Sequence, residues 1–174
     1  MSVIPANPKI ANSKPYTGNS DGAAPAPRAG MDEWIRQAVK YANGSIWNNG
    51  SWGVRDMKGT PGSLSVHATG RAVDLSYRKT DKQPTANRKG AVAFLNIVTA
   101  NANALGLECV LDYFPQKFGR GWRCDRQAWK SYSKPEIHGA PGGLWHHYEI
   151  SPAMADSPAL VKQAFQRVFA EIPQ

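Results

Sequence analysis

The sequence predicts an α+β fold in which an antiparallel sheet is covered by two or three helices. Apolar residues recur at helical spacing over residues 31–42, residues 86–104 and a C-terminal stretch that starts near residue 157. Polar and apolar residues alternate over residues 71–77 and 145–150, as they do in strands with one face buried. A chain of 174 residues with this apolar content suits one domain with a substantial core.

The chain divides at the start of the first predicted helix. Residues 1–30 contain five prolines among Ala, Asn, Ser and Gly without periodicity, so we expect an extended arm there. Residues 31–174 then form the domain, beginning with a helix that Asn43 and Gly44 end. Whether the arm wraps the domain or hangs free is left open by its sequence.

The second half of the chain is predicted to hold a helix and then a hairpin. Thr85 is the expected N-cap of the helix over residues 86–104, and the hairpin strand 107–113 returns through glycines to Trp122 and Cys124. Cys109 and Cys124 would therefore be neighbours, either as a disulfide or as two buried thiols.

A turn over residues 151–155 is expected to precede the last helix. Asp156 or Ser157 would cap this helix, with Pro158 in its first turn. Its buried stripe is predicted to comprise Leu160, Val161, Ala164, Phe165, Val168 and Phe169.

The first group of candidate metal-binding residues lies in the stretch Ser-Val-His-Ala-Thr-Gly-Arg-Ala-Val-Asp at residues 65–74. Gly70 permits a turn, so that His67 and Asp74 can converge on one ion. Alternation after the turn places Asp74 on the face opposite to Val73 and Leu75. Imidazole with carboxylate is a normal ligand set for zinc, and a catalytic zinc site has three protein ligands and one open position.

The third ligand is expected in a second cluster, Trp-His-His-Tyr-Glu-Ile at residues 145–150. In a strand, His147 shares a face with Trp145 and Glu149, whereas His146 shares the other face with Tyr148 and Ile150. We therefore predict one Zn²⁺ ion held by His67, Asp74 and His147.

The pattern Ser-x-His-x-x-Gly-x-Ala-x-Asp followed by a distant His resembles the zinc superfamily of D-Ala-D-Ala carboxypeptidases, lysostaphin-type endopeptidases and hedgehog amino-terminal domains. The likeness is greatest to the D-Ala-D-Ala carboxypeptidase branch, which includes many bacteriophage endolysins. His-Tyr-Glu-Ile is similar to the run around the family's last zinc ligand, which favours His147. The Trp145-His146 pair also resembles a Trp-His form of that motif, so His146 stays an alternative.

The resemblance also implies roles for Arg55 and Ser65. Arg55 lies where the family usually carries an arginine, which would hold a substrate carboxylate or the oxyanion formed during attack. A surface ion pair with Asp56 is the alternative for Arg55. Ser65 is similar to the family serine that hydrogen-bonds substrate, and it could equally cap the turn.

The general base departs from the family pattern. Related enzymes usually have Glu or Asp three residues before the last His, but Leu144 occupies that position, or Gly143 if His146 is the ligand. Our choice for the base is Glu136, on a loop that could fold back over the metal. The other candidates are His138, Glu149 and Asp112, and Asp112 could instead pair with a nearby arginine.

Charge and the resemblance together favour a cell-wall substrate. The formal charge of +8 indicates an anionic partner, whether nucleic acid, membrane surface or cell-wall polymer. Residues 116–134 mix basic and aromatic side chains without a nucleic-acid recognition motif, so we favour a groove wall facing peptidoglycan over a nucleic-acid surface. No classical signal peptide and no membrane span are evident.

The predicted function is that of a monomeric zinc peptidase that cuts a peptide bond of bacterial peptidoglycan. The resemblance implies a phage endolysin made in the host cytoplasm and let out to the wall by a separate protein, which could be the catalytic piece of a longer lysin. A rival hypothesis is a hedgehog-like wall-binding module that keeps zinc without hydrolysis, and the missing acid before His147 gives it weight. A basic nucleic-acid-binding protein is the other rival.

Overall fold

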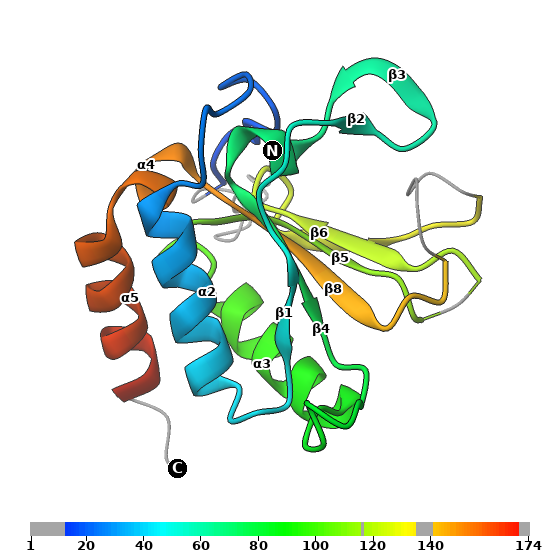
Figure 1. Ribbon diagram of the computed structural model, residues 1–174, viewed down its shortest axis with the longest axis vertical. Coiled ribbons are helices and arrows are strands. Elements are labelled where there is room, and N and C mark those ends of the chain that lie inside the picture. Colours follow the sequence, from blue (N-terminus) through cyan, green and yellow to red (C-terminus); the bar gives the residue numbers. More distant parts are fainter. Residues whose placement is uncertain (1–12, 116, 135–140, 171–174) are drawn as a thin grey trace, which may run out of the picture.

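The molecule is built on one antiparallel sheet of six strands (Figure 1). The structure is a computed structural model and describes residues 13–115, 117–134 and 141–170. The strands are ordered β1-β4-β8-β5-β6-β7 across the sheet, and every neighbouring pair is antiparallel. Their bounds are β1 Trp47–Gly50, β4 Ala72–Ser76, β5 Leu107–Asp112, β6 Arg120–Arg123, β7 Ala128–Ser131 and β8 Trp145–Ile150.

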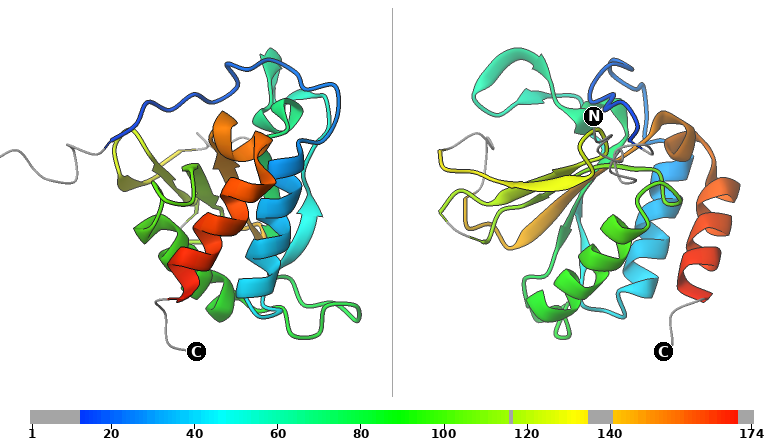
Figure 2. Two further views of the ribbon diagram at one scale, coloured as in Figure 1. Left: turned by 90° about the vertical axis from the view of Figure 1, so that its left-hand side faces the viewer. Right: turned by 180° about the vertical axis from the view of Figure 1, so that it is seen from behind.

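Helices cover one face of this sheet. The long ones are α2 (Ala29–Tyr41), α3 (Arg88–Ala100) and α5 (Pro158–Ala170), and the short α4 (Pro152–Asp156) links β8 to α5 at one end of the helix layer (Figures 1 and 2). A small hairpin of β2 (Asp56–Met57) and β3 (Thr60–Leu64) projects from the other side. The predicted α+β class, with an antiparallel sheet and several helices, is confirmed.

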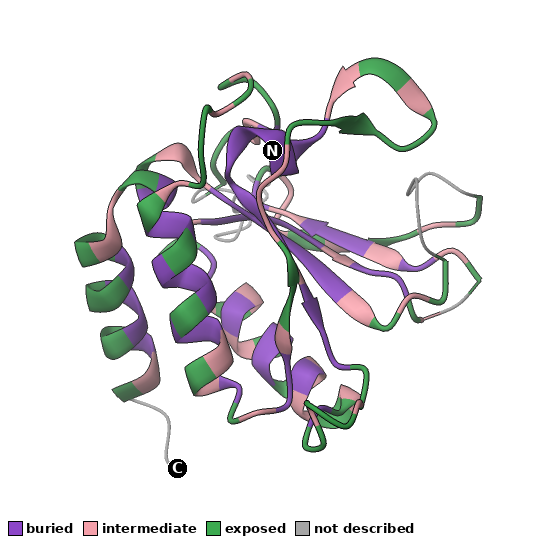
Figure 3. Ribbon diagram, in the orientation of Figure 1, coloured by how far each residue is buried: buried purple, intermediate pink, exposed green. Residues whose placement is uncertain are grey.

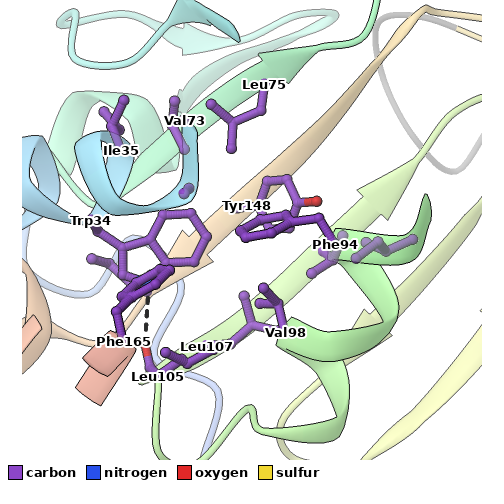
Figure 4. Close-up of a cluster of buried hydrophobic side chains, with 14 of the residues drawn as sticks. Trp34, Ile35, Val73, Leu75, Phe94, Val98, Leu105, Leu107, Tyr148 and Phe165 are labelled. Carbon is purple, nitrogen blue, oxygen red and sulfur yellow. Dashed lines mark hydrogen bonds between the residues drawn. The ribbon is translucent and has the colours of Figure 1, made fainter. Parts of the chain in front are cut away.

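The core lies between the sheet and these helices, as the buried helix faces in Figure 3 indicate. Trp34 of α2 is fully buried at its centre, with ring centroids 5.5 Å from both Tyr148 and Phe165 and 6.5 Å from Phe94 (Figure 4). The Trp34 indole donates a hydrogen bond to the Leu105 carbonyl, so the polar atom of this large side chain is satisfied. Because the apolar side chains of each strand are buried against the helices, the alternate side chains of that strand must point to the opposite face of the sheet.

Both alternating segments are strands with the predicted orientation. Val73 and Leu75 of β4 and Tyr148 of β8 are fully buried in the core, whereas Asp74 and His147 point to the other face. The sheet therefore carries Asp74 and His147 on the face that the helices leave uncovered.

Several boundaries differ from the prediction. Helix α3 begins at Arg88, because the Asn87 side chain accepts the Gly90 N–H while the Thr85 hydroxyl donates to the Gly44 carbonyl. It ends at Ala100 instead of residue 104, and the predicted turn at 151–155 is largely the helix α4. Leu160 was wrongly placed in the buried stripe of α5, since it is 40% exposed.

The two cysteines are buried free thiols, which is the second of the two alternatives for them. Cys109 in β5 pairs across the sheet with Arg123, one residue before Cys124. Burial raises the pKa of the Cys109 thiol well above its ordinary value and that of Cys124 to about 11. Both groups are therefore neutral, unreactive thiols at physiological pH.

The described part of the predicted arm, residues 13–28, lies along the end of the molecule next to the 3₁₀ helix η1 (Val66–Thr69) (Figure 2). The Ala24 N–H bonds the Ala68 carbonyl at 2.8 Å, and the Arg28 guanidinium bonds Asp156 at 2.7 Å. Helix α2 starts directly after this segment. Across the described residues, no helix has both the length and the apolar character that a membrane crossing requires.

Three arginines in the described part of the predicted basic stretch form contacts with their own chain. Arg123 forms an ion pair with Asp125, Arg120 binds the Asp112 carboxylate, and the Arg126 guanidinium donates to the Gly121 carbonyl. These three arginines therefore contribute less free positive surface than the sequence indicates.

Candidate metal centre

The first ligand candidate is presented by a short, well-capped turn. The Ser65 hydroxyl accepts the His67 N–H at 3.3 Å and so caps η1. Gly70 ends η1 with φ +72°, a conformation that favours glycine, and the chain then turns into β4. This geometry places His67 in the turn that directly precedes the strand carrying Asp74.

Asp74 and His147 are direct cross-strand partners on β4 and β8. His147 Nδ1 lies 3.0 Å from Asp74 Oδ1, and His67 Nε2 lies 3.5 Å from the same oxygen. One ligand atom from each of the three side chains falls within 4.8 Å of the other two. The three predicted ligands are thus brought together from two distant segments of the chain.

The remaining nitrogen of each imidazole has a protein acceptor. His67 Nδ1 lies 2.5 Å from the Ser51 carbonyl oxygen, so Nδ1 carries the proton and Nε2 faces Asp74. His147 Nε2 lies 2.9 Å from Glu149 Oε1, which leaves Nδ1 to face Asp74. Metal-binding histidines typically donate their second N–H to a carbonyl or carboxylate in this way, because that contact fixes the ring and its tautomer.

Glu149 is itself held in place by the N-terminal segment. The Tyr16 hydroxyl donates to Glu149 Oε2 at 2.7 Å, and the Arg123 guanidinium lies 4.2 Å from the centre of the Tyr16 ring. Both carboxylate oxygens of the buried Glu149 are therefore engaged. This arrangement supports an orienting role for Glu149 rather than the base role that the sequence left open.

His146 and Asp112 belong to a separate cluster on the helix side of the sheet. His146 is fully buried, with Nδ1 3.2 Å from the Tyr148 hydroxyl and Nε2 3.6 Å from Asp112 Oδ1. Arg88 and Arg120 bind the same Asp112 carboxylate. The alternation of β8 thus separates His146 from the metal group, and Asp112 pairs with arginines, as its alternative interpretation held.

The electrostatics of the group match a site for a cation. Burial raises the pKa of Asp74, but hydrogen bonds from His147 and His67 outweigh it and hold that pKa well below its usual range. Burial lowers the pKa of His147, yet hydrogen bonds to Asp74 and Glu149 dominate and raise it to about 10. Without a metal, a proton on His147 lets the ring donate to both carboxylates and offsets one of their two negative charges.

A cleft of about 450 Å³ opens over the group. Arg55, Asp56 and Ser65 contribute to its lining, so the predicted substrate-binding residues lie at the same cleft as the ligands. Ser65 lines the cleft and also caps η1, which joins the two roles left open for it. The aromatic side chains of the lining are Tyr16, Tyr113, Tyr132 and Trp145.

Two of the base candidates, Glu136 and His138, lie outside the described residues. Sequence reasoning missed Ser51 and Tyr16, because neither lies in a periodic segment or in a motif. Glu149 did carry a signal, since alternation already placed it on the face of His147.

The residues present fit a zinc ion. Two imidazoles and one carboxylate are a common zinc donor set, and each ring is already oriented by an outer contact. Comparisons of the chain with models of protein families, with curated proteins and with solved structures find no match. The protein is an α+β domain in which three side chains that could hold a metal ion meet on the open face of the sheet.

Replacing Glu149 with glutamine is expected to weaken zinc affinity by about tenfold while the three ligands stay in place. Glutamine can still accept from His147 Nε2, but it removes the negative charge that makes the imidazole a stronger ligand. Competition titration with a zinc chelator measures the change. The matched control is Asp125→Asn, which removes a carboxylate that pairs with Arg123 and lies outside the metal group, and equal loss in both variants would contradict an orienting role.

Zinc binding is expected to release about one proton at neutral pH. In the metal-free protein the His147 pKa of about 10 lies above its ordinary value of 6.5, so the ring is protonated at pH 7.5 and must lose its Nδ1 proton to bind a cation. Apparent zinc affinity should therefore rise about tenfold per pH unit below pH 10. Titration calorimetry in two buffers of different ionisation enthalpy counts the protons, and a count near zero would contradict this assignment.

Proposed function

We propose that this protein is a zinc-dependent peptidase that hydrolyses a peptide bond of bacterial peptidoglycan. The observation that carries the proposal is the convergence of His67, Asp74 and His147 at one cleft together with Arg55. The motif around His67 and Asp74, which resembles that of D-Ala-D-Ala carboxypeptidases and related endopeptidases, gives the substrate class. The bond is either the terminal D-Ala-D-Ala bond or one within the stem peptides and their cross-links.

Each residue has a distinct part in the proposed reaction. His67, Asp74 and His147 would hold the zinc ion, which would supply Lewis-acid chemistry at the cleft. Arg55 lines the cleft and offers a guanidinium that stays charged, which suits a substrate carboxylate or a developing oxyanion. Ser65 offers a hydrogen bond at the wall of the cleft. Glu136 is the proposed base, because Glu149 and Asp112 already have other partners.

The setting follows from the same resemblance. We propose a monomeric phage endolysin, made in the host cytoplasm and acting on the wall after release. The positive charge of +8 supports this, because the wall polymers of many bacteria are anionic.

The proposed base is tested with Glu136→Gln. This variant is expected to lower kcat by about 100-fold or more while zinc affinity stays unchanged, because the side chain moves a proton and holds no metal. Glu136→Asp serves as the matched variant, with partial activity expected since the carboxylate is kept. Full activity of Glu136→Gln would move the base to another residue.

A non-catalytic, zinc-containing wall-binding module is the second candidate. The observation that favours it is Leu144, which stands where related enzymes have an acid. Mass spectrometry of peptidoglycan incubated with the protein, with and without chelator, separates the two functions. New peptide termini that vanish with chelator support the peptidase, and intact fragments that co-sediment with the protein support the binding module.

A further inference from the structure

A second cavity, of about 580 Å³, lies at the far end of the sheet from β1. Its lining comes from the last turn of α3, from the turns that follow it, and from the hairpin of β6 and β7. We call it the α3–β7 groove. It shares no lining residue with the metal cleft.

The α3–β7 groove and the metal cleft are on opposite faces of the sheet. Trp122 and Trp129 are direct cross-strand partners on β6 and β7, and both line the groove. The neighbouring pair Gly121 and Lys130 points the other way, and Gly121 follows Leu111 and His147 in the same row across the sheet. A ligand in the groove therefore does not compete with a substrate at the metal.

The chemistry of the groove differs from that of the protein as a whole. Among the described residues, none that line it is acidic, basic or histidine, although the chain carries a net charge of +8. Its walls combine the partly buried indole of Trp129 and the largely buried Trp122 with the side-chain amides of Asn96, Asn101, Asn103 and Gln127. Indole rings offer a flat apolar surface, and amides offer both donors and acceptors. This combination suits an uncharged ligand that is apolar on its faces and polar at its edges.

Several of these side chains are held in place. The Arg120 guanidinium lies 4.2 Å from the centre of the Trp129 ring and is itself bound to the buried Asp112. The Asn101 amide donates to the Ile97 carbonyl at 2.9 Å. The backbone at Gln127, in the turn between β6 and β7, has φ +46°, a left-handed conformation that is uncommon for a residue other than glycine and that does not bear on how its side chain is held. Rigid walls lower the entropy that binding costs.

We propose that the α3–β7 groove binds uncharged acetamido-sugar units of a polysaccharide chain. Pyranose rings have apolar C–H faces that stack on an indole, and their hydroxyl and acetamido groups lie at the ring edges, where they reach the amides. Sugar binding stands independently of hydrolysis, whereas the choice of acetamido sugars rests on the proposed peptidoglycan substrate. The groove would then hold the glycan strand while the metal cleft acts on a peptide.

Titration calorimetry of the metal-free, full-length protein with the tetramer of N-acetylglucosamine tests this inference. We expect binding at one site, with affinity lowered at least about tenfold by Trp129→Ala because stacking area is lost. Chelator-treated protein is used so that failure of the peptidase proposal leaves this result intact. Asp74→Ala, which removes a metal ligand on the other face, is expected to bind the tetramer like the parent protein.

A second variant, Gln127→Gly, distinguishes loss of a groove contact from unfolding of the protein. Glycine adopts positive φ freely, so this variant is expected to be at least as thermally stable as the parent while it binds the tetramer severalfold more weakly. Absence of tetramer binding, or equal binding by the parent, Trp129→Ala and Gln127→Gly proteins, would overturn the inference. Displacement of the tetramer by a sugar-free stem peptide would overturn it too.

Discussion

Replacing Asp74 with alanine is expected to lower zinc affinity by more than about 100-fold and to remove hydrolysis with it. Asp74 Oδ1 lies within 3.5 Å of nitrogens of both His67 and His147, so it is the anionic centre of the group. Loss of an outer partner of a metal ligand typically costs 10–100-fold in affinity, and loss of a ligand costs more. The two imidazoles alone would leave the ion with an incomplete donor set.

Zinc content after dialysis and peptidoglycan digestion measure this effect in parallel. Asp56→Ala is the matched control, because Asp56 lines the same cleft but is exposed and lies outside the three-residue group. The control should keep one zinc ion per chain. Retention of zinc by Asp74→Ala with full activity would contradict the assignment of the ligands.

Replacing Arg71 with methionine is expected to destabilise the fold by about 3–5 kcal/mol. Arg71 is fully buried and donates to the Ile150 carbonyl and to Glu108, and its other amino group donates to the Gly18 carbonyl. Methionine fills similar space but leaves the buried Glu108 without its main positive partner. Removing one member of a buried ion pair is costly because the remaining charge stays desolvated.

Urea unfolding followed by tryptophan fluorescence measures the free energy of unfolding of this variant. Arg167→Met is the matched control: Arg167 is exposed in the last turn of α5, so a change within about 0.5 kcal/mol is expected. Equal stability of the two variants would show that Arg71 does not anchor residues 13–28 to the sheet.

The parts of the site that local periodicity controls were predictable from the sequence. Alternation in residues 145–150 separated His147 from His146, and the same rule placed Asp74 opposite Val73. Gly70 signalled the turn that joins His67 to β4. The ligand set is confirmed as a geometric group because strand pairing and a single turn are enough to build it.

The parts that depend on long-range packing were not predictable. Tyr16 reaches Glu149 from 133 residues away in a segment without periodicity, and Ser51 accepts from His67 through its backbone. The N-cap of α3 is Asn87 and not the predicted Thr85, because the Thr85 hydroxyl donates to the Gly44 carbonyl. Leu160 fits the apolar spacing of α5, but it stays 40% exposed to solvent within the described part of the chain.

The central claim is that His67, Asp74 and His147 bind one divalent cation. Its most direct test is a crystal structure of the zinc-soaked protein with anomalous data on both sides of the zinc absorption edge. The account predicts one strong peak bonded to His67 Nε2, an Asp74 oxygen and His147 Nδ1, at distances of about 2.0–2.2 Å. A zinc peak at another place would contradict the claim. So would the absence of a peak at saturating zinc, with Asp74 still hydrogen-bonded to His147.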